Sequence, residues 1–170
     1  MSPEGINLGL PQLLILLVAL QRLGELVYAR RNDRRLRAAG GVEHGARHYP
    51  LLVGLHTAWL VALVATVPAG AQILAVPLAA FLMLQGLRVW TLVSLGRFWT
   101  TRVIVVPGSE RVRSGPYRIL RHPNYLIVAL EIPILPLVFG AWPLAIGFGL
   151  VNLAVLAWRI RVEERALAAA

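Results

Sequence analysis

The stretch RHPNYLIVALEIPILPL, residues 121–137, joins a polar cluster to an apolar segment. Its first five residues are rich in hydrogen-bonding groups, and the rest suits hydrocarbon except for Glu131, about two turns inside the apolar run. A carboxylate at membrane depth costs free energy unless it faces a bundle interior or a wet cavity. The stretch therefore predicts a membrane helix that begins beside a polar site.

The composition of the whole chain agrees with a membrane location. Of its 170 residues, 58% are hydrophobic, which is more apolar surface than a soluble domain of this size can bury. Cysteine is absent, so disulfides, thiolate catalysis and cysteine-rich zinc sites are excluded. All 17 basic residues are arginine, which keeps its charge when partly buried.

Several apolar stretches are long enough to cross a bilayer, which takes roughly 20 helical residues. The predicted spans are residues 8–29, 50–67, 71–95, 124–140 and 142–158. We therefore predict an all-α, multi-pass integral membrane bundle of about five transmembrane helices. The first span lacks a basic leading region and a cleavage site, so we expect it to remain as an anchor rather than act as a signal peptide.

The chain shows no internal repeat, so we predict a single membrane domain over residues 1–170. Residues 1–95 hold three spans, residues 96–122 form a cytoplasmic loop, and residues 123–170 form a helical hairpin with a C-terminal tail that builds the functional site. The loop contains β-branched residues and Pro-Gly turns, which favour turns and a short extended piece over a span.

The arginines follow the first span, fill the loop between the third and fourth spans, and follow the last span. The other two connections, near residues 68–70 and 140–141, carry no charge. By the positive-inside rule, the N-terminus lies outside and the C-terminus lies in the cytoplasm. We expect a bacterial cytoplasmic membrane protein whose active site faces the cytoplasm.

Every predicted span carries a polar residue roughly 9 to 13 Å from its cytoplasmic end, at about 1.5 Å per residue. These residues are Arg22, His56, Arg88, Glu131 and Asn152. One interpretation is a set of structural ion pairs, Arg22 with Glu25 and Arg88 with Glu131. The other is a cavity that opens to the cytoplasm, which we favour because all five spans mark the same layer.

Two polar segments lie at the mouth of this expected cavity. SGPYRILRHPNY, residues 114–125, ends where Pro123 opens the fourth span, so free backbone N–H groups and a positive helix end lie beside Arg121 and His122. This arrangement predicts an anion site. WRIRVEERAL, residues 158–167, places Arg159 and Glu163 four residues apart. Contact with lipid headgroups or a surface helix pair would also explain these charges.

A metal site is not expected. His44 and His48 have the spacing of two ligands on one helical face, but no acidic third ligand stands in fixed relation to them.

These elements together resemble the isoprenylcysteine carboxyl methyltransferase and phospholipid methyltransferase group of integral membrane enzymes. The resemblance covers about the last seventy residues. It is carried by the Gly-x-Tyr, Arg-His-Pro-x-Tyr and Arg-x-x-x-Glu-Glu elements, in this order and separated by one helical hairpin. The sequence departs from the group at Ser109, where a histidine is often found, and at residues 126–127, where a glycine commonly follows the motif tyrosine.

The resemblance implies methyl transfer from S-adenosyl-L-methionine bound on the cytoplasmic side. The cofactor-binding residues it implies, together with the neighbouring charges that suit the cofactor, are Ser109, Glu110, Arg111, Val112, Tyr117, Arg121, His122, Pro123, Asn124, Tyr125, Arg159, Glu163 and Glu164. A cationic site suits the carboxylate of the cofactor, a glutamate suits its ribose hydroxyls, and aromatic faces such as that of Trp99 suit its sulfonium.

Three residues are predicted to act on the methyl acceptor. Arg159 is expected to hold a carboxylate or phenolate near the sulfonium, and Glu131 or His56 is expected to accept a proton from a hydroxyl. The acceptor is expected to be a lipophilic small molecule that enters sideways from the bilayer, and membrane lipids are the other expected partners. We expect no nucleic-acid partner.

The choice of acceptor follows from a narrower resemblance. The arginine-rich first helix and residues 87–108 are similar to the bacterial subgroup of alkylresorcinol and alkylpyrone O-methyltransferases. This favours a long-chain phenol or hydroxypyrone over an isoprenylcysteine-like substrate. Two alternatives from other classes are a small transporter that couples protons through Glu25 and a membrane scaffold that uses its basic faces.

Overall fold

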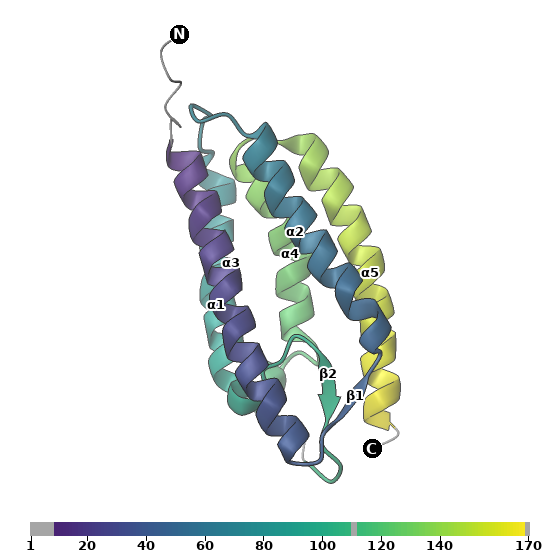
Figure 1. Ribbon diagram of the computed structural model, residues 1–170. Coiled ribbons are helices and arrows are strands. Elements are labelled where there is room, and N and C mark those ends of the chain that lie inside the picture. Colours follow the sequence, from purple (N-terminus) through teal and green to yellow (C-terminus); the bar gives the residue numbers. More distant parts are fainter. Residues whose placement is uncertain (1–8, 110–111, 169–170) are drawn as a thin grey trace.

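The computed structural model describes residues 9–109 and 112–168, apart from the side chain of His48. Its helices form one antiparallel bundle (Figure 1). They are α1 (Leu10–Ala38), α2 (Tyr49–Thr66), α3 (Ala75–Leu95), α4 (Pro123–Val138) and α5 (Trp142–Ala168). The predicted fold class, an all-α multi-pass membrane bundle, is confirmed.

Four of these helices, α1, α2, α3 and α5, are long and apolar enough to cross a membrane. The remaining helix, α4, is also apolar but has only 16 residues. The predicted spans coincide with these five helices, although α1 and α5 continue well past their apolar parts, to Ala38 and Ala168. The predicted start of the first span, at residue 8, lies outside the described residues.

Helix α4 is central, and it packs most extensively against α3 and α5. It contains Pro133 and Pro136, and a proline inside a helix leaves the carbonyl four residues earlier without its N–H partner. For Pro136 that carbonyl belongs to Ile132, and it accepts a hydrogen bond from the buried Trp59 Nε1 at 3.1 Å. The indole of α2 thus satisfies a polar group that α4 cannot satisfy by itself.

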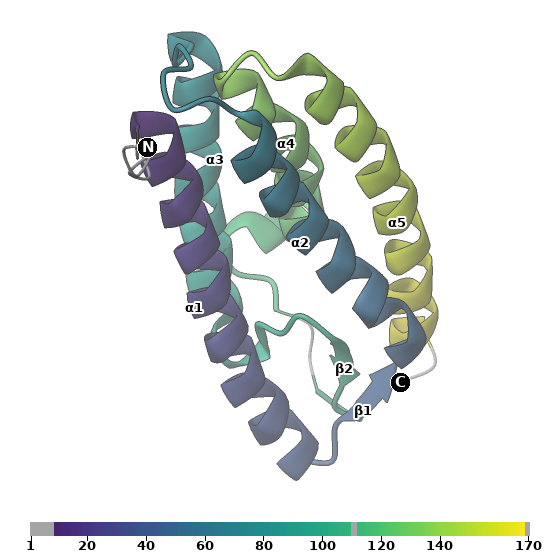
Figure 2. The ribbon, with the colours of Figure 1, turned by 45° about the horizontal axis from the view of Figure 1, so that its top comes forward.

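The segments outside the membrane bundle form a small polar cap. After α1 ends, Gly40 adopts a positive φ of 83°, and β1 (Val42–His44) pairs antiparallel with β2 (Val103–Val105). Three 3-10 turns, Ala46–His48, Gly96–Phe98 and Gly115–Arg118, complete the connections. Figure 2 shows the chain between α3 and α4, which includes β2, lying between α1 and α5.

An ion cluster fastens this small sheet to α1. Glu43 of β1 pairs with Arg37 of α1 and, at 2.5 Å, with Arg102 just before β2. The guanidinium of Arg102 also lies 4.1 Å from the ring centre of Tyr49. Burial by itself would raise the pKa of Glu43. The hydrogen bonds from Arg37 and Arg102 and the charges of these arginines outweigh burial, so the pKa lies below the usual 4.5.

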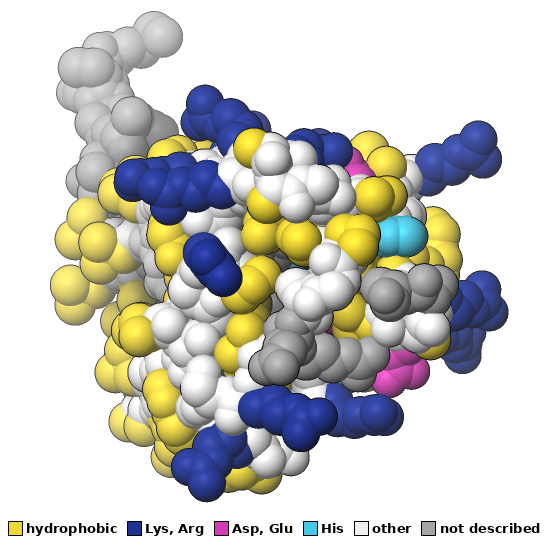
Figure 3. Space-filling view, turned by 90° about the horizontal axis from the view of Figure 1, so that it is seen from below, with side chains coloured by type: hydrophobic (Ala, Val, Ile, Leu, Met, Phe, Trp, Pro, Cys, Tyr) yellow, Lys and Arg dark blue, Asp and Glu magenta, His cyan; other side chains and the backbone are white. Residues whose placement is uncertain are grey.

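Arginine side chains gather around the end of the bundle that carries β1 and β2 (Figure 3). This grouping agrees with the charge pattern on which the predicted topology depends, because the uncharged connections lie at the opposite end. Which end faces the cytoplasm stays a prediction.

Candidate functional site

A cavity of about 160 Å³ lies between the segment that joins α3 to α4, the first residues of α4 and the last turns of α5. Its lining combines aromatic rings with charges from several elements. The polar and aromatic lining residues are Phe98, Trp99, Thr100, Arg102, Tyr117, Arg121, His122, Asn124, Tyr125, Arg159 and Glu163. The two polar segments that the sequence placed at the mouth of a cavity are therefore neighbours in space.

Tyr125 is at the centre of this cavity wall. Its hydroxyl accepts a hydrogen bond from Arg159 Nε at 2.8 Å and donates one to Glu163. Arg159 also donates from Nη2 to the carbonyl of Thr101 at 2.8 Å, and only 7% of it is exposed. The interpretation of Arg159 and Glu163 as a surface helix pair is therefore wrong, because the tyrosine hydroxyl lies between a buried arginine and the glutamate.

His122 and Glu163 face each other across the site at a distance too long for a hydrogen bond. His122 Nδ1 lies 3.7 Å from Glu163 Oε1, and the histidine ring stacks on Tyr125 with the ring centres 5.5 Å apart. Glu163 Oε1 is therefore not hydrogen-bonded to His122, while Glu163 Oε2 accepts from Tyr125 and His122 Nε2 contacts Glu164.

The two adjacent glutamates differ in their surroundings. The Glu163 side chain is 26% exposed and lines the cavity, whereas that of Glu164 is 51% exposed and does not. Glu164 Oε1 lies 3.4 Å from His122 Nε2 and 3.9 Å from Arg121, whose side chain is 83% exposed. Of the two, Glu163 is the better placed to contact a ligand.

The other residues implied for the cofactor are spread over the loop. Tyr117 lines the cavity, where burial, and then the charge of Glu163, raise the pKa of its phenol. Pro123 is the buried first residue of α4. Ser109 is exposed and donates to the carbonyl of Val106 at 2.8 Å, and neither it nor Val112 lines the cavity. Glu110 and Arg111 lie outside the described residues.

A second cavity, of about 400 Å³, lies deeper in the bundle between α1 and α2. Apolar side chains of both helices line it, and several of them, such as Leu23 and Val61, are also exposed on the outer surface of the bundle. The two cavities share a wall. Its members are Trp99, Thr100, Asn124, Tyr125 and Arg159.

A buried network, which we call the charged quartet, borders this second cavity. It consists of Arg22, Glu25, Arg88 and Glu131. Glu131 accepts hydrogen bonds from both arginines and from Gln85, and Glu25 accepts from both arginines and from Gln21. The two ion pairs predicted separately are thus one network with equal numbers of positive and negative charges.

Glu131 is not among the residues that line either cavity. It is 1% exposed, and both of its carboxylate oxygens accept hydrogen bonds from arginine. This environment suits a residue that holds Arg22 and Arg88 in place better than one that accepts a proton.

His56 is differently placed, because it lines the second cavity. Its Nδ1 lies 2.9 Å from the carbonyl oxygen of Leu52. Since a carbonyl can only accept, Nδ1 carries the proton in the neutral ring, and Nε2 is then the nitrogen with a free lone pair. Asn152, the remaining member of the expected polar layer, instead donates to the carbonyl of Val128 and joins α5 to α4.

Sequence reasoning identified Asn124, Tyr125 and Arg159 of the shared wall but missed the part that comes from the loop after α3. Thr100 and Thr101 were not singled out, and Trp99 was considered only for its aromatic face. The carbonyl of Trp99 accepts a hydrogen bond from the buried Asn32 of α1 at 2.9 Å. The one indication in the sequence that this loop contacts α1 was the polar Asn32 within a basic helical segment. The sequence did not indicate which residue Asn32 would bond.

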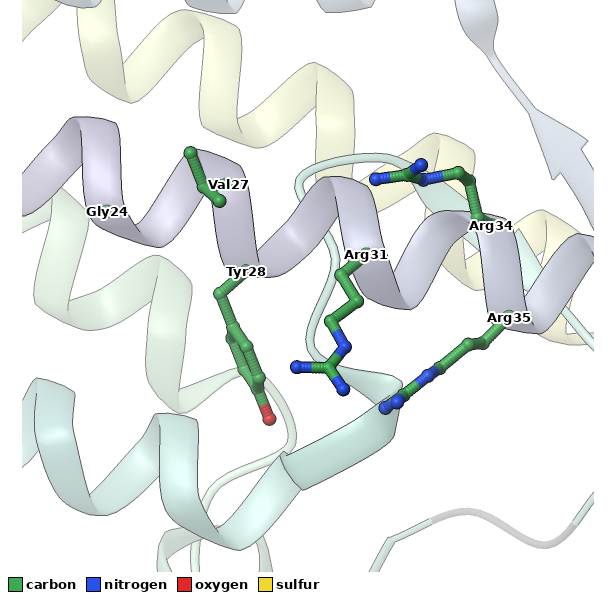
Figure 4. Close-up of a pocket in the computed structure, with 6 residues that line it drawn as sticks. All are labelled: Gly24, Val27, Tyr28, Arg31, Arg34 and Arg35. Atoms are coloured by element: carbon green, nitrogen blue, oxygen red, sulfur yellow. The ribbon is translucent and has the colours of Figure 1, made fainter.

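A surface depression of about 650 Å³ lies elsewhere, and all of its lining residues belong to α1 (Figure 4). In this view Tyr28, Arg31 and Arg35 extend to one side of the helix and Val27 and Arg34 to the other. It contains neither a carboxylate nor a histidine, so the chemistry of the motif residues is absent from it. Within residues 9–109 and 112–168, no group of His, Asp and Glu could hold a metal ion.

Comparison with known proteins identifies two uncharacterized relatives. The chain is 38% identical over 160 residues to the uncharacterized protein YpbQ of Bacillus subtilis. This alignment covers 91% of this chain and 95% of that protein. The chain is 28% identical over 144 residues to an uncharacterized protein of Haemophilus influenzae, covering 81% and 83% of the two chains. No solved structure matches.

A family model also matches, over residues 73–169, which include α3, α4, α5 and all the polar residues of the smaller cavity. That model describes the isoprenylcysteine carboxyl methyltransferase (ICMT) family. The match spans more than half of the chain and agrees with the bundle of apolar helices. The protein therefore belongs to the isoprenylcysteine carboxyl methyltransferase family and is an integral membrane methyltransferase.

Proposed function

We propose that this protein transfers a methyl group from S-adenosyl-L-methionine to the oxygen of a lipophilic acceptor. The observation that carries the proposal is the wall shared by the two cavities, at Tyr125 and Arg159. The smaller cavity has a mixed polar and apolar lining and adjoins the basic end of the bundle. The larger cavity is mainly apolar and adjoins the exposed apolar surface of α1 and α2. A charged nucleoside and a lipid can therefore meet there.

The smaller cavity suits the cofactor by the chemistry of its donors and acceptors. Arg121 and His122, at the start of α4, can bind a carboxylate. Glu163 Oε1, which contacts His122 only at 3.7 Å, can accept from ribose hydroxyls. The buried Asn124 Oδ1 has no hydrogen-bond partner among the described residues, so it can accept from the cofactor's amino group.

When bound, S-adenosyl-L-methionine would supply an electrophilic methyl group for the acceptor oxygen, with neutral S-adenosylhomocysteine as the leaving group. The protein's contribution is orientation and the exclusion of water. Arg159, fixed by Tyr125 and Thr101, holds the negative oxygen at the shared wall. His56 Nε2 takes the proton from an acceptor hydroxyl, directly or through one water molecule.

A hydroxyl acceptor is favoured because the larger cavity contains His56. A phenol or enol must lose a proton before or during transfer, whereas a carboxylate is already ionised at neutral pH. Together with the subgroup resemblance, this favours a long-chain phenol or hydroxypyrone. Carboxyl methylation of an isoprenylcysteine-like substrate is the second candidate, since Arg159 can also receive a carboxylate.

The proposal includes a direction of entry for each ligand. The cofactor enters from the arginine-rich end, which the positive-inside rule places in the cytoplasm of a bacterial cell. The acceptor enters from the bilayer between α1 and α2, where exposed apolar residues continue into the larger cavity. The charged quartet is then part of the cavity's structure, and Glu131 holds its arginines.

Binding of S-adenosylhomocysteine to the detergent-solubilised protein tests the proposal. We expect micromolar binding by the wild type and a loss of at least about tenfold in affinity for His122→Ala, in line with the removal of a charged contact. No binding by the wild type at millimolar ligand would overturn the proposal and favour a transporter or a scaffold.

A second experiment separates the two acceptor classes. The proposal expects His56→Gln to lower methylation of a long-chain phenol by about 100-fold, as for the loss of a general base. Methylation of a prenylated cysteine analogue, if it occurs, should be nearly unchanged. A variant with full activity on the phenol would contradict the role of His56, and activity only on the carboxylate would favour the second candidate.

A further inference from the structure

An unpaired hydrogen-bond donor lies in the wall that the two cavities share. Trp99 lines both cavities and is 4% exposed, and its buried Nε1 has no hydrogen-bond partner among the described residues. Since leaving a buried N–H without a partner is unfavourable, nearly all such groups are bonded in folded proteins. A donor of this kind in a cavity wall points to a ligand atom that accepts.

The backbone that carries this indole is held by hydrogen bonds on both sides. The carbonyl of Trp99 accepts from Asn32 at 2.9 Å, and its backbone N–H donates to the carbonyl of Gly96 at 3.0 Å. Two residues later, the carbonyl of Thr101 accepts from Arg159 Nη2 at 2.8 Å. The same short segment therefore carries the indole and anchors the guanidinium, so that both groups occupy the shared wall.

The charge balance of the larger cavity leaves one cation for the acceptor. The charged lining residues are Arg22, Glu25, Arg88 and Arg159. Arg22 and Arg88 are compensated by Glu25 and Glu131 within the charged quartet. Arg159 instead bonds a neutral hydroxyl and a carbonyl, so its positive charge is available to an anionic oxygen.

We propose that Trp99 Nε1–H and Arg159 form a two-donor subsite for the nucleophilic oxygen of the methyl acceptor. This inference rests on the proposed function and adds the residues that hold the acceptor oxygen. Two fixed donors stabilise an oxygen that becomes negative as its proton leaves, so the subsite takes acidic hydroxyls, namely phenols and enols. A protonated amine is excluded, because it offers no lone pair to the indole and is repelled by Arg159.

The test compares Trp99→Phe with Trp142→Phe, the same change at a residue that is 61% exposed and borders neither cavity. The acceptors are a long-chain meta-alkylphenol and the matching meta-alkylthiophenol, whose sulfur is a weak hydrogen-bond acceptor. We expect Trp99→Phe to lower kcat/KM about tenfold for the phenol and less than about twofold for the thiophenol. Its affinity for S-adenosylhomocysteine should stay within about twofold of the wild type.

Equal losses on both acceptors, or no loss on either, would overturn the subsite and leave the proposed function intact. A loss of S-adenosylhomocysteine affinity in Trp99→Phe would also overturn it, by placing the indole on the cofactor. If the variant does not fold, the NMR spectrum of wild-type protein with isotope-labelled tryptophan tests the same contact. One indole N–H signal should move downfield on addition of the phenol, and an unchanged spectrum would overturn the proposal. Absent binding of S-adenosylhomocysteine by the wild type would instead overturn the proposed function.

Discussion

The charged quartet inside the bundle and the cavity mouth at its basic end both contain arginine and glutamate, but their polar groups are bonded differently. In the quartet, every carboxylate oxygen of Glu25 and Glu131 accepts a hydrogen bond. At the mouth, His122 stands 3.7 Å from Glu163, and Trp99 Nε1 and Asn124 Oδ1 have no partner in the described part of the chain. Arg22 Nε of the quartet also has no partner among the described residues, but all of the quartet's carboxylate oxygens are bonded. We therefore assign the quartet to stabilising the fold and the mouth to binding.

The largest expected effect is on stability and comes from breaking the quartet. Glu131→Ala leaves Arg88, which is 3% exposed, without its main counter-ion. We expect the free energy of unfolding to fall by about 3 to 5 kcal/mol, the cost of an uncompensated buried charge. Denaturant titration of the detergent-solubilised protein measures it.

The matched control for that experiment is Glu164→Ala, which removes the same side chain from an exposed position at the mouth. It should change the free energy of unfolding by no more than about 0.5 kcal/mol. If Glu131→Ala cost less than about 1 kcal/mol, the quartet would not be the structural element that we infer.

The next effect is on ligand affinity at the mouth. Glu163→Gln keeps the shape of a side chain that lines the smaller cavity and removes its charge. We expect the Kd for S-adenosylhomocysteine to rise at least about tenfold, or about 1.4 kcal/mol, while stability hardly changes. Calorimetry or thermal-shift titration measures the Kd. Glu164→Gln should stay within about twofold, and equal effects of the two substitutions would contradict the assignment of Glu163.

An effect of similar size tests how the loop at the mouth is held to α1. Asn32 Nδ2 donates to the carbonyls of Gly96 and Trp99, and Asn32 is fully buried. Asn32→Ala leaves these carbonyls without that donor, so we expect a loss of about 1 to 2 kcal/mol in stability. Thr57→Ala, an exposed residue of α2, is the control. A loss no greater than that of the control would show that the loop does not depend on α1.

Hydropathy and charge were enough to predict the helices, because each span must hide its backbone in lipid and its flanks carry arginine. The pairing of β1 with β2 was missed, since Val42 and Val105 are far apart in the chain and each strand has only three residues. Short strands carry little periodic signal of their own, so their pairing depends on the tertiary contacts of Arg102 and Glu43.

At the site, the motifs identified which residues come together but not how they bond. Helical spacing showed Arg159 and Glu163 on one face of α5, and it could not show Tyr125 of α4 between them. The two predicted ion pairs likewise became one network, because Arg22 reaches across to Glu131 at 2.9 Å. Spacing reports neighbours within a helix, whereas both of these bonds cross between helices.

The smallest effect concerns the third ionic group, the cluster of Arg37, Glu43 and Arg102 outside the membrane spans. Hydrogen bonds from the two arginines outweigh burial and leave the pKa of Glu43 below 4.5 in the folded state. A carboxyl whose pKa is lower when folded stabilises the protein at pH values above its unfolded pKa and loses that contribution as the pH falls through the folded value.

Wild type should thus exceed Glu43→Gln in stability by less than about 1 kcal/mol near neutral pH, the size expected of a partly solvated ion pair. The difference should vanish in acid and shrink in high salt. A difference that grew as the pH fell would contradict this sign, and one as large as that of Glu131→Ala would erase the contrast between buried and solvated charges.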